Sequence, residues 1–185
     1  MAKLHDAVIV VDVESTCWEG SPPKGQQSDI IEVGLCLLDL KTLERSEKRA
    51  LMIQPARSTI SPFCTELTTI SAADLADAGS LADACQTLRR ELRSRDRPWA
   101  SFGDYDRNQF RRNCEDLGVA YPFGPRHLNV KSLLAMALGW DKELGMARAL
   151  DALGFPLEGT HHRGVDDAWN IARLLAEVFR RTRAS

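Results

Sequence analysis

The chain has 185 residues, of which 44% are hydrophobic, and a formal net charge of −2 from 24 basic and 26 acidic side chains. This length favours one domain over residues 1–185, with a core over about residues 7–180. No apolar run approaches the roughly 20 residues that a membrane-spanning helix needs, so no membrane association is expected. The slight negative charge argues against holding nucleic acid by bulk electrostatics, but an acidic pocket filled by metal ions remains compatible with it.

The cysteines and the first residues favour a reducing, cytoplasmic location. The five cysteines are dispersed without CxxC spacing, which indicates structural thiols rather than disulfides or a zinc cluster. The opening residues, MAKLHDA, lead directly into a strand-like run, so we expect neither a signal peptide nor a transit peptide.

Three strand-like segments come first. Residues 7–13, AVIVVDV, are apolar and β-branched, as in a buried central strand. A second apolar segment covers residues 30–40, and a turn at 41–44 leads to a third strand around 49–54. The short connections predict an antiparallel meander.

Helices alternate with short strands in the rest of the sequence. Short strands are predicted at residues 99–102 and 128–130. Helices are predicted from about residue 71, over residues 81–92, 107–117, 131–138 and 143–153, and from Asp166 or Asp167 onward. Strands followed by alternating strands and helices indicate an α/β domain with a mixed sheet.

Asp12 and Glu14 stand at the end of the first strand. Side chains two residues apart on a strand share a face, so both carboxylates point the same way. A divalent cation with hard oxygen ligands would remove the repulsion between them. On this spacing alone, two solvated surface acids are the favoured interpretation.

Two further segments carry candidate residues. In GDYDRNQF, residues 103–110, either Asp104 or Asp106 stands where a helix begins, a position at which helix capping is the ordinary role. In GTHHRGVDDAWNIARLL, residues 159–175, two histidines precede a helix that opens with two acids. The spacing allows either His161 with Asp166 or His162 with Asp167. Acids and a histidine at these element ends could converge on one point.

The motifs VVDVESTCWEG, IIEVG, PFCTELTTI, FGDYDRNQF and HRGVDDAWNIA, in this order, resemble the DEDDh exonucleases of the DnaQ-like, ribonuclease-H-like superfamily. The residues of these motifs are most similar to those of the Eri-type and KapD-like RNA exonucleases, and the resemblance runs from about Val8 to Leu175. It implies an α/β ribonuclease-H-like fold, a mixed five-stranded sheet flanked by helices.

The resemblance also implies a site and a reaction. Asp12, Glu14, Asp106 and Asp167 would hold two Mg²⁺ ions, for which Mn²⁺ could substitute, and His162 would be the general base. The reaction would be two-metal hydrolysis of 3′ ends of single-stranded RNA or DNA, with RNA favoured, releasing nucleoside 5′-monophosphates. The alternatives are a DNA-directed 3′-to-5′ exonuclease and a catalytically silent nucleic-acid-binding module.

Substrate contacts follow from the same resemblance. It implies that Phe63 and Leu67 form a hydrophobic wedge beside the terminal base, with core packing as the alternative. Tyr105 would stack on the 3′-terminal nucleotide, and backbone groups from Val13 to Thr16 would bind its sugar. The sequence does not decide between a monomer and a homodimer. Eight arginines predict either a solvated helix surface or a basic rim for a phosphate backbone; they are Arg89, Arg90, Arg93, Arg95, Arg97, Arg107, Arg111 and Arg112.

Overall fold

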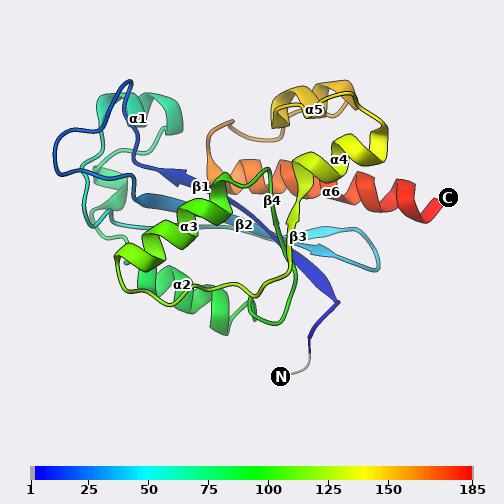
Figure 1. Cartoon of the computed structure of the whole chain (residues 1–185), viewed down its shortest axis with the longest axis horizontal. Coiled ribbons are helices and arrows are strands. Elements are labelled where there is room, and N and C mark those ends of the chain that lie inside the picture. The colour runs from blue at the N-terminus through cyan, green and yellow to red at the C-terminus, as the bar shows by residue number, and fades with distance from the viewer. Residues whose placement is uncertain (1–2, 185) are drawn as a thin grey trace.

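A computed structural model describes residues 3–184 and shows a mixed sheet with helices on both faces (Figure 1). The sheet order is β3-β2-β1-β4-β5. Its strands are β1 (Ala7–Ser15), β2 (Ile30–Asp39), β3 (Arg45–Met52), β4 (Trp99–Ser101) and β5 (His127–Asn129). The first three strands pair antiparallel, and β4 and β5 join them in parallel.

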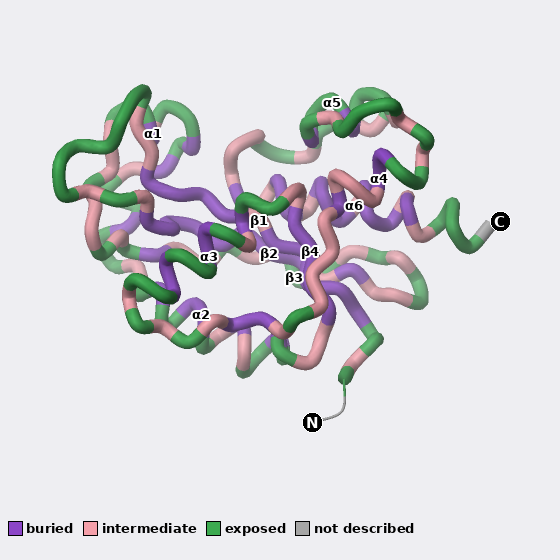
Figure 2. Tube along the Cα trace, viewed as in Figure 1, coloured by how far each residue is buried: buried purple, intermediate pink, exposed green. Residues whose placement is uncertain are grey.

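Strand β1 lies at the centre of the sheet, and its side chains alternate between two cores. Ile9, Val11 and Val13 face a core formed with helices α2 (Leu81–Arg90) and α3 (Tyr105–Asp116). Val8 and Val10 face the opposite core. Both faces of β1 are apolar because each face packs in a core, and Figure 2 shows the central strands as buried.

The second core lies under the helices of the C-terminal half. These are α4 (Val130–Leu138), α5 (Met146–Ala152) and α6 (Gly164–Ala184). Helix α6 is the long helix that crosses the sheet in Figure 1, with its first turn near the end of β1. Because residues two apart on a strand share a face, the side of β1 that carries Val8 and Val10 also carries Asp12 and Glu14 toward α6.

Helix α1 (Pro62–Thr68) and the short 3-10 helix η1 (Ala73–Leu75) lie beyond the end of β1. The thiol of Cys64 contacts the backbone oxygen of Ser15 at 3.6 Å, which joins α1 to the last residue of β1. The sequence did not predict α1. Its signals are nevertheless present, since the Ser61 hydroxyl accepts from the Cys64 N–H and Pro62 occupies the first turn.

Several predicted boundaries need correction. The helix expected from residue 71 is only the single turn η1, although Asp74 accepts from the Ser71 N–H and hydroxyl just as Asp83 accepts from Ser80 at the start of α2. The third strand begins at Arg45 rather than near residue 49, directly after the turn. Helix α6 begins at Gly164, so both Asp166 and Asp167 lie within its first turn. The predicted meander and the mixed α/β sheet are confirmed.

The other predicted elements are present with ends shifted by at most three residues. Strand β1 continues two residues beyond the predicted end, which places Glu14 inside the strand. Helix α3 starts at Tyr105 and α5 at Met146. Among residues 3–184, no helix is both long enough and apolar enough to cross a membrane.

Candidate active site

The two acids of β1 lie at the edge of a cavity rather than on an open surface. Glu14 is only 8% exposed, and Asp12 is partly buried. Both line a cavity of about 310 Å³ at the end of β1. The interpretation of these residues as ordinary solvated acids is therefore wrong.

Asp106 reaches the same cavity from the first turn of α3. Parallel pairing of β4 with β1 brings the turn after Ser101 beside the end of β1. The Val13 N–H, between Asp12 and Glu14 in the chain, donates to Asp106 Oδ1 at 2.9 Å. Asp104 does not line the cavity and forms an ion pair with Arg107 at 3.0 Å, so of these two acids the structure brings only Asp106 to the site.

The two acids of α6 point in different directions. Asp167 is 4% exposed and lines the cavity, whereas Asp166 pairs with Lys48 at 2.6 Å and accepts from the Thr160 N–H. Oxygen atoms of Asp12, Glu14 and Asp167 all lie within 4.8 Å of one another. The first turn of α6 thus brings Asp167 to the two carboxylates of β1, from which it is more than 150 residues distant in the sequence.

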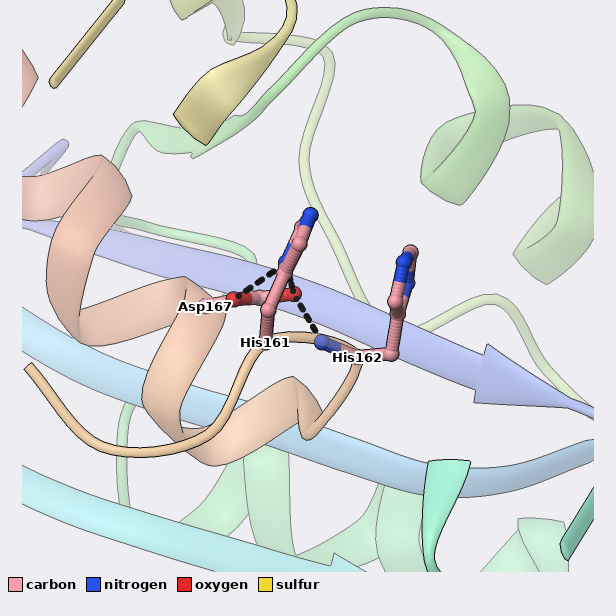
Figure 3. Close-up of side chains that lie close together, drawn as sticks. All are labelled: His161, His162 and Asp167. Atoms are coloured by element: carbon pink, nitrogen blue, oxygen red, sulfur yellow. Dashed lines mark hydrogen bonds and ion pairs between the residues drawn. The ribbon is translucent and has the colours of Figure 1, made fainter. Parts of the chain in front are cut away.

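Both histidines of the preceding loop line the cavity, but they relate differently to Asp167 (Figure 3). The His161 ring contacts the Asp167 carboxylate through Nδ1, at 3.0 Å from Oδ2. His162 donates to the same oxygen only through its backbone N–H, also at 3.0 Å. The two rings stack with centroids 4.0 Å apart. Within the described residues, the His162 ring makes no hydrogen bond, so it is free to contact a water molecule.

Repulsion and burial shape the protonation of the acids. Burial, reinforced by the charges of Asp167, Glu32 and Asp106, raises the pKa of Glu14 from its ordinary value to about 9. The pKa of Asp12 is also raised, first by burial and then by the neighbouring carboxylates. Burial raises the pKa of Asp106 to about 6, against the Val13 N–H bond that favours its ionised form.

The pKa values of the two residues on the α6 side shift in opposite directions. Burial raises the pKa of Asp167, while His161 opposes that change. Burial and the neighbouring His161 lower the pKa of His162, which keeps its ring neutral near pH 7.

The donor set fits a divalent metal ion. Clustered carboxylates supply the hard oxygen ligands that Mg²⁺ and Mn²⁺ prefer. The raised pKa values show that the protein alone does not compensate these charges when all of them are ionised. A bound cation would supply the missing positive charge.

The predicted substrate contacts are only partly gathered at the cavity. Val13, Leu67 and Tyr105 line it, and Phe63 does not. Phe63, Leu67 and Tyr105 are 37%, 36% and 58% exposed, so the core-packing alternative for Phe63 and Leu67 is wrong. The Val13 N–H is already bound by Asp106, and the Thr16 N–H donates to Asp29 O. These two amides are therefore occupied.

Sequence reasoning missed two residues at this edge, Ser15 and Glu32. The Ser15 hydroxyl is buried beside Tyr105 in the cavity wall and has no hydrogen-bond partner of normal geometry among residues 3–184. Glu32 is fully buried opposite Glu14 on β2. The signal for Glu32 was present as a single acid inside the apolar segment IIEVG.

The eight arginines do not line this cavity. Arg93 and Arg97 pair with Asp96 and Asp6, and Arg89 donates to the Ala120 carbonyl. These partners favour the solvated-surface interpretation for the arginines of residues 89–97.

The fold and the converging carboxylates define the ribonuclease-H-like exonuclease class, as the sequence motifs predicted. Residues 9–175 match the Exonuclease family RNase_T, and the chain belongs to this family.

Comparison with individual proteins agrees with this assignment. The chain is 28% identical to the "3′-5′ exonuclease Snipper" of Drosophila melanogaster, over 95% of this chain and 70% of that protein. It is 26% identical to the human "3′-5′ exoribonuclease 1", over 95% of this chain and 53% of that protein. The chain therefore spans about half the length of the human relative.

Two solved structures share the fold. The nuclease domain of 3′hExo, described as a DEDDh family member bound to rAMP, superposes with a TM-score of 0.80 at 23% identity, over 97% of this chain and 94% of that one. The Mg²⁺- and Mn²⁺-bound form of S. pombe Pop2p superposes with a TM-score of 0.69 at 17% identity, over 92% of this chain and 82% of that one.

Proposed function

We propose that the chain is a metal-dependent 3′-to-5′ exonuclease that acts on single-stranded RNA 3′ ends and releases nucleoside 5′-monophosphates. The observation that carries this proposal is the convergence of Asp12, Glu14 and Asp167 within 4.8 Å, in a cavity that also contains Asp106 and two histidines. The names of the curated relatives, an exonuclease and an exoribonuclease, support the direction and the RNA substrate.

Each site residue has a role in this proposal. Asp12, Glu14, Asp106 and Asp167 would hold two divalent ions, which would supply positive charge to stabilise the attacking and leaving oxygens of an in-line displacement. His162 accepts the proton of the attacking water, because its ring is neutral and makes no hydrogen bond to the described protein. His161 orients the Asp167 carboxylate through Nδ1. Magnesium is the proposed ion, with manganese as a substitute, and the Pop2p structure was solved with both.

Other residues that line the cavity can contact the terminal nucleoside. Tyr105 offers an exposed ring for stacking, worth about 1–3 kcal/mol per base, and Leu67 lies in the wall as an apolar contact. The Ser15 hydroxyl has no hydrogen-bond partner of normal geometry among residues 3–184, so it can bind a sugar hydroxyl of the terminal nucleotide. Phe63 lies outside the cavity, and we propose that it contacts the base next to the terminal one. Val13 forms part of the cavity wall, with its N–H donating to Asp106.

A reducing compartment, the cytoplasm, is the proposed location, since all five cysteines are free thiols in the structure. DNA is the second candidate substrate, because the 3′ ends of DNA strands carry the same phosphodiester bonds. Matched RNA and DNA oligomers of one sequence separate the two. The proposal predicts faster degradation of RNA, and equal rates would contradict the RNA preference.

The direct test of activity uses one single-stranded RNA labelled at its 5′ end and a second labelled at its 3′ end. With Mg²⁺, the 3′ label is expected to appear at once in a mononucleotide, while the 5′ label passes through a ladder of shortened products. Internal cleavage fragments would contradict an exonuclease, and no cleavage with either metal would favour the silent binding module.

A further inference from the structure

Glu32 is a fully buried carboxylate beside the proposed metal site. It lies on β2 directly opposite Glu14 in the antiparallel register, with a relative exposure of 0%. A buried charge of this kind is costly unless it is paired and hydrogen-bonded. The energetic cost of placing a second glutamate here calls for a compensating interaction.

Within residues 3–184, that compensation comes from the first residues of α6 and from Arg163, which directly precedes the helix. Glu32 Oε2 accepts from the Gly164 N–H at 3.1 Å and from Arg163 Nε at 3.2 Å. Oε1 accepts from the Val165 N–H at 3.3 Å. These backbone N–H groups have no partner within the helix, so the carboxylate satisfies them and also interacts favourably with the helix dipole.

Two glycines allow α6 to approach the strands closely enough for these bonds. A Cβ atom on Gly34 of β2 would lie only 1.8 Å from the Gly164 carbonyl carbon. A Cβ atom on Gly164 would lie 3.0 Å from the Asp12 carbonyl oxygen. The backbone at the start of α6 therefore rests directly on the strands that carry Asp12 and Glu14.

Glu32 does not itself face the cavity. Both of its oxygens accept from protein N–H groups, and it is absent from the cavity wall, which Asp167 lines three residues after Gly164. We propose that Glu32 is a positioning residue: it fixes the first turn of α6 on β1 and β2 and thereby sets the Asp167 carboxylate against Asp12 and Glu14 for metal binding. This inference rests on the proposed function of the site.

Arg163 extends the same connection to α1. Its Nη1 donates to Thr69 Oγ1 at 3.4 Å, and Thr69 is the residue that ends α1. Glu32 is therefore connected through Arg163 to α1, the helix that carries Leu67.

Asp29 supplies a matched control. It is also a buried acid, 2% exposed, directly before β2, and it pairs with Arg57 at 2.6 Å. Within residues 3–184 its hydrogen-bond partners are Arg57 and Thr16, which lie in segments other than α6. Asp29→Asn therefore removes a buried, ion-paired charge without touching α6.

The test compares Glu32→Gln, Glu32→Ala and Asp29→Asn in the full chain. Three quantities are measured: hydrogen–deuterium exchange over residues 160–170, the rise in Tm on adding Mn²⁺, and the rate of RNA cleavage against Mg²⁺ concentration. In Glu32→Ala we expect faster exchange at residues 164–167, a smaller Mn²⁺ effect, and kcat lower by about 10- to 100-fold with KM unchanged. Glu32→Gln, which retains one acceptor oxygen, is expected to fall between Glu32→Ala and the unmodified protein.

Asp29→Asn is expected to lower Tm in the absence of metal but to leave the exchange of residues 160–170 and the metal titration unchanged. Wild-type exchange and metal response in both Glu32 variants would overturn the inference. An equal loss of metal response in Asp29→Asn would also overturn it, because a general loss of stability would then explain the effect. If the unmodified protein neither cleaves RNA nor gains Tm with Mn²⁺, the proposed function fails instead, independently of Glu32.

Discussion

The Val13 N–H donates to Asp106 Oδ1 at 2.9 Å, so the backbone between the two acids of β1 is bonded directly to the acid of α3. Residues 93 positions apart are thereby held at one edge of the sheet. One oxygen of Asp106 thus accepts a backbone hydrogen bond at the edge where the metal site is proposed.

This bond predicts different outcomes for two substitutions of Asp106. Asp106→Asn retains an acceptor for the Val13 N–H, so it should fold with nearly unchanged stability but lose nuclease activity with the charge. Asp106→Ala leaves a buried N–H unpaired and should lose activity and also about 1–3 kcal/mol in the free energy of unfolding. Urea denaturation and RNA cleavage assays of both variants measure these effects. Equal stability of the two variants would show that the bond contributes little.

The raised pKa of Glu14 predicts an unusual pH dependence of stability without metal. The folded pKa of about 9 lies above the ordinary value of 4.5, so between these pH values the folded state binds more protons than the unfolded state. The contribution of this group to stability is therefore present at low pH and is lost as pH rises toward 9. Tm of the metal-free protein should fall over this window, and the fall should be smaller in Glu14→Gln. An identical pH profile in the variant would contradict the assignment.

Metal binding should be linked to the same protons. Since a carboxylate must be ionised to bind a cation, binding of Mn²⁺ at pH 7 is expected to release protons. Calorimetric titrations in two buffers of different ionisation enthalpy measure the number released. Heats that are independent of the buffer would mean that these acids are already ionised in the metal-free protein.

Substitutions of the two histidines should impair different steps, His162 the chemical step and His161 metal binding. His162 has a backbone φ of 62°, so His162→Asn is the suitable substitution, because asparagine tolerates this conformation. It should lower kcat by about 10²- to 10⁴-fold, the usual contribution of a general base, with the metal titration unchanged. His161→Asn, the matched control, should mainly raise the metal concentration needed for activity. The reverse pattern would assign the base to His161.

Much of the fold was predictable because its signals are local. The continuous apolar, β-branched run at residues 7–13 and the short connections that follow indicate a central strand in a meander. The failures arose where short-range signals compete. Ser71 to Asp74 has the residues of a helix start, yet the chain forms only η1, while the capped helix α1 has just seven residues and little periodicity to reveal it.

The site shows a similar division. Spacing could place Asp12 and Glu14 on one face, but it left Asp166 and Asp167 equivalent. The family resemblance chose Asp167, and the structure places Asp167 in the cavity and Asp166 against Lys48 of β3. Spacing also did not indicate that His161 would contact the Asp167 carboxylate. The role of Glu32 could not be assigned from sequence, since its partners, two backbone N–H groups and the Arg163 side chain, lie more than 130 positions away.

The Ser15 hydroxyl, which has no hydrogen-bond partner of normal geometry among the described residues, predicts that Ser15→Ala affects only substrate binding. Ser15→Ala should fold with stability at least equal to that of the unmodified protein, because it removes a buried polar group without a normal partner. If the hydroxyl binds the terminal sugar, KM for 3′-hydroxyl RNA should rise by about 3- to 10-fold, as expected for one hydrogen bond of roughly 0.5–1.5 kcal/mol. The same KM shift on RNA ending in 3′-deoxyadenosine would place the contact elsewhere.

The most direct test of the central claim is the release of nucleoside 5′-monophosphates from single-stranded RNA by three samples: the protein with Mg²⁺, the protein with chelator, and Asp12→Ala with Mg²⁺. If the carboxylates at the end of β1 act through bound metal, nucleoside 5′-monophosphates are released only in the first sample. Adding excess Mg²⁺ to the second sample should restore their release. Asp12→Ala should remain folded by circular dichroism. Release of mononucleotides in the presence of chelator would contradict metal-dependent hydrolysis at this site. Release by a folded Asp12→Ala variant at the rate of the unmodified protein would contradict it too.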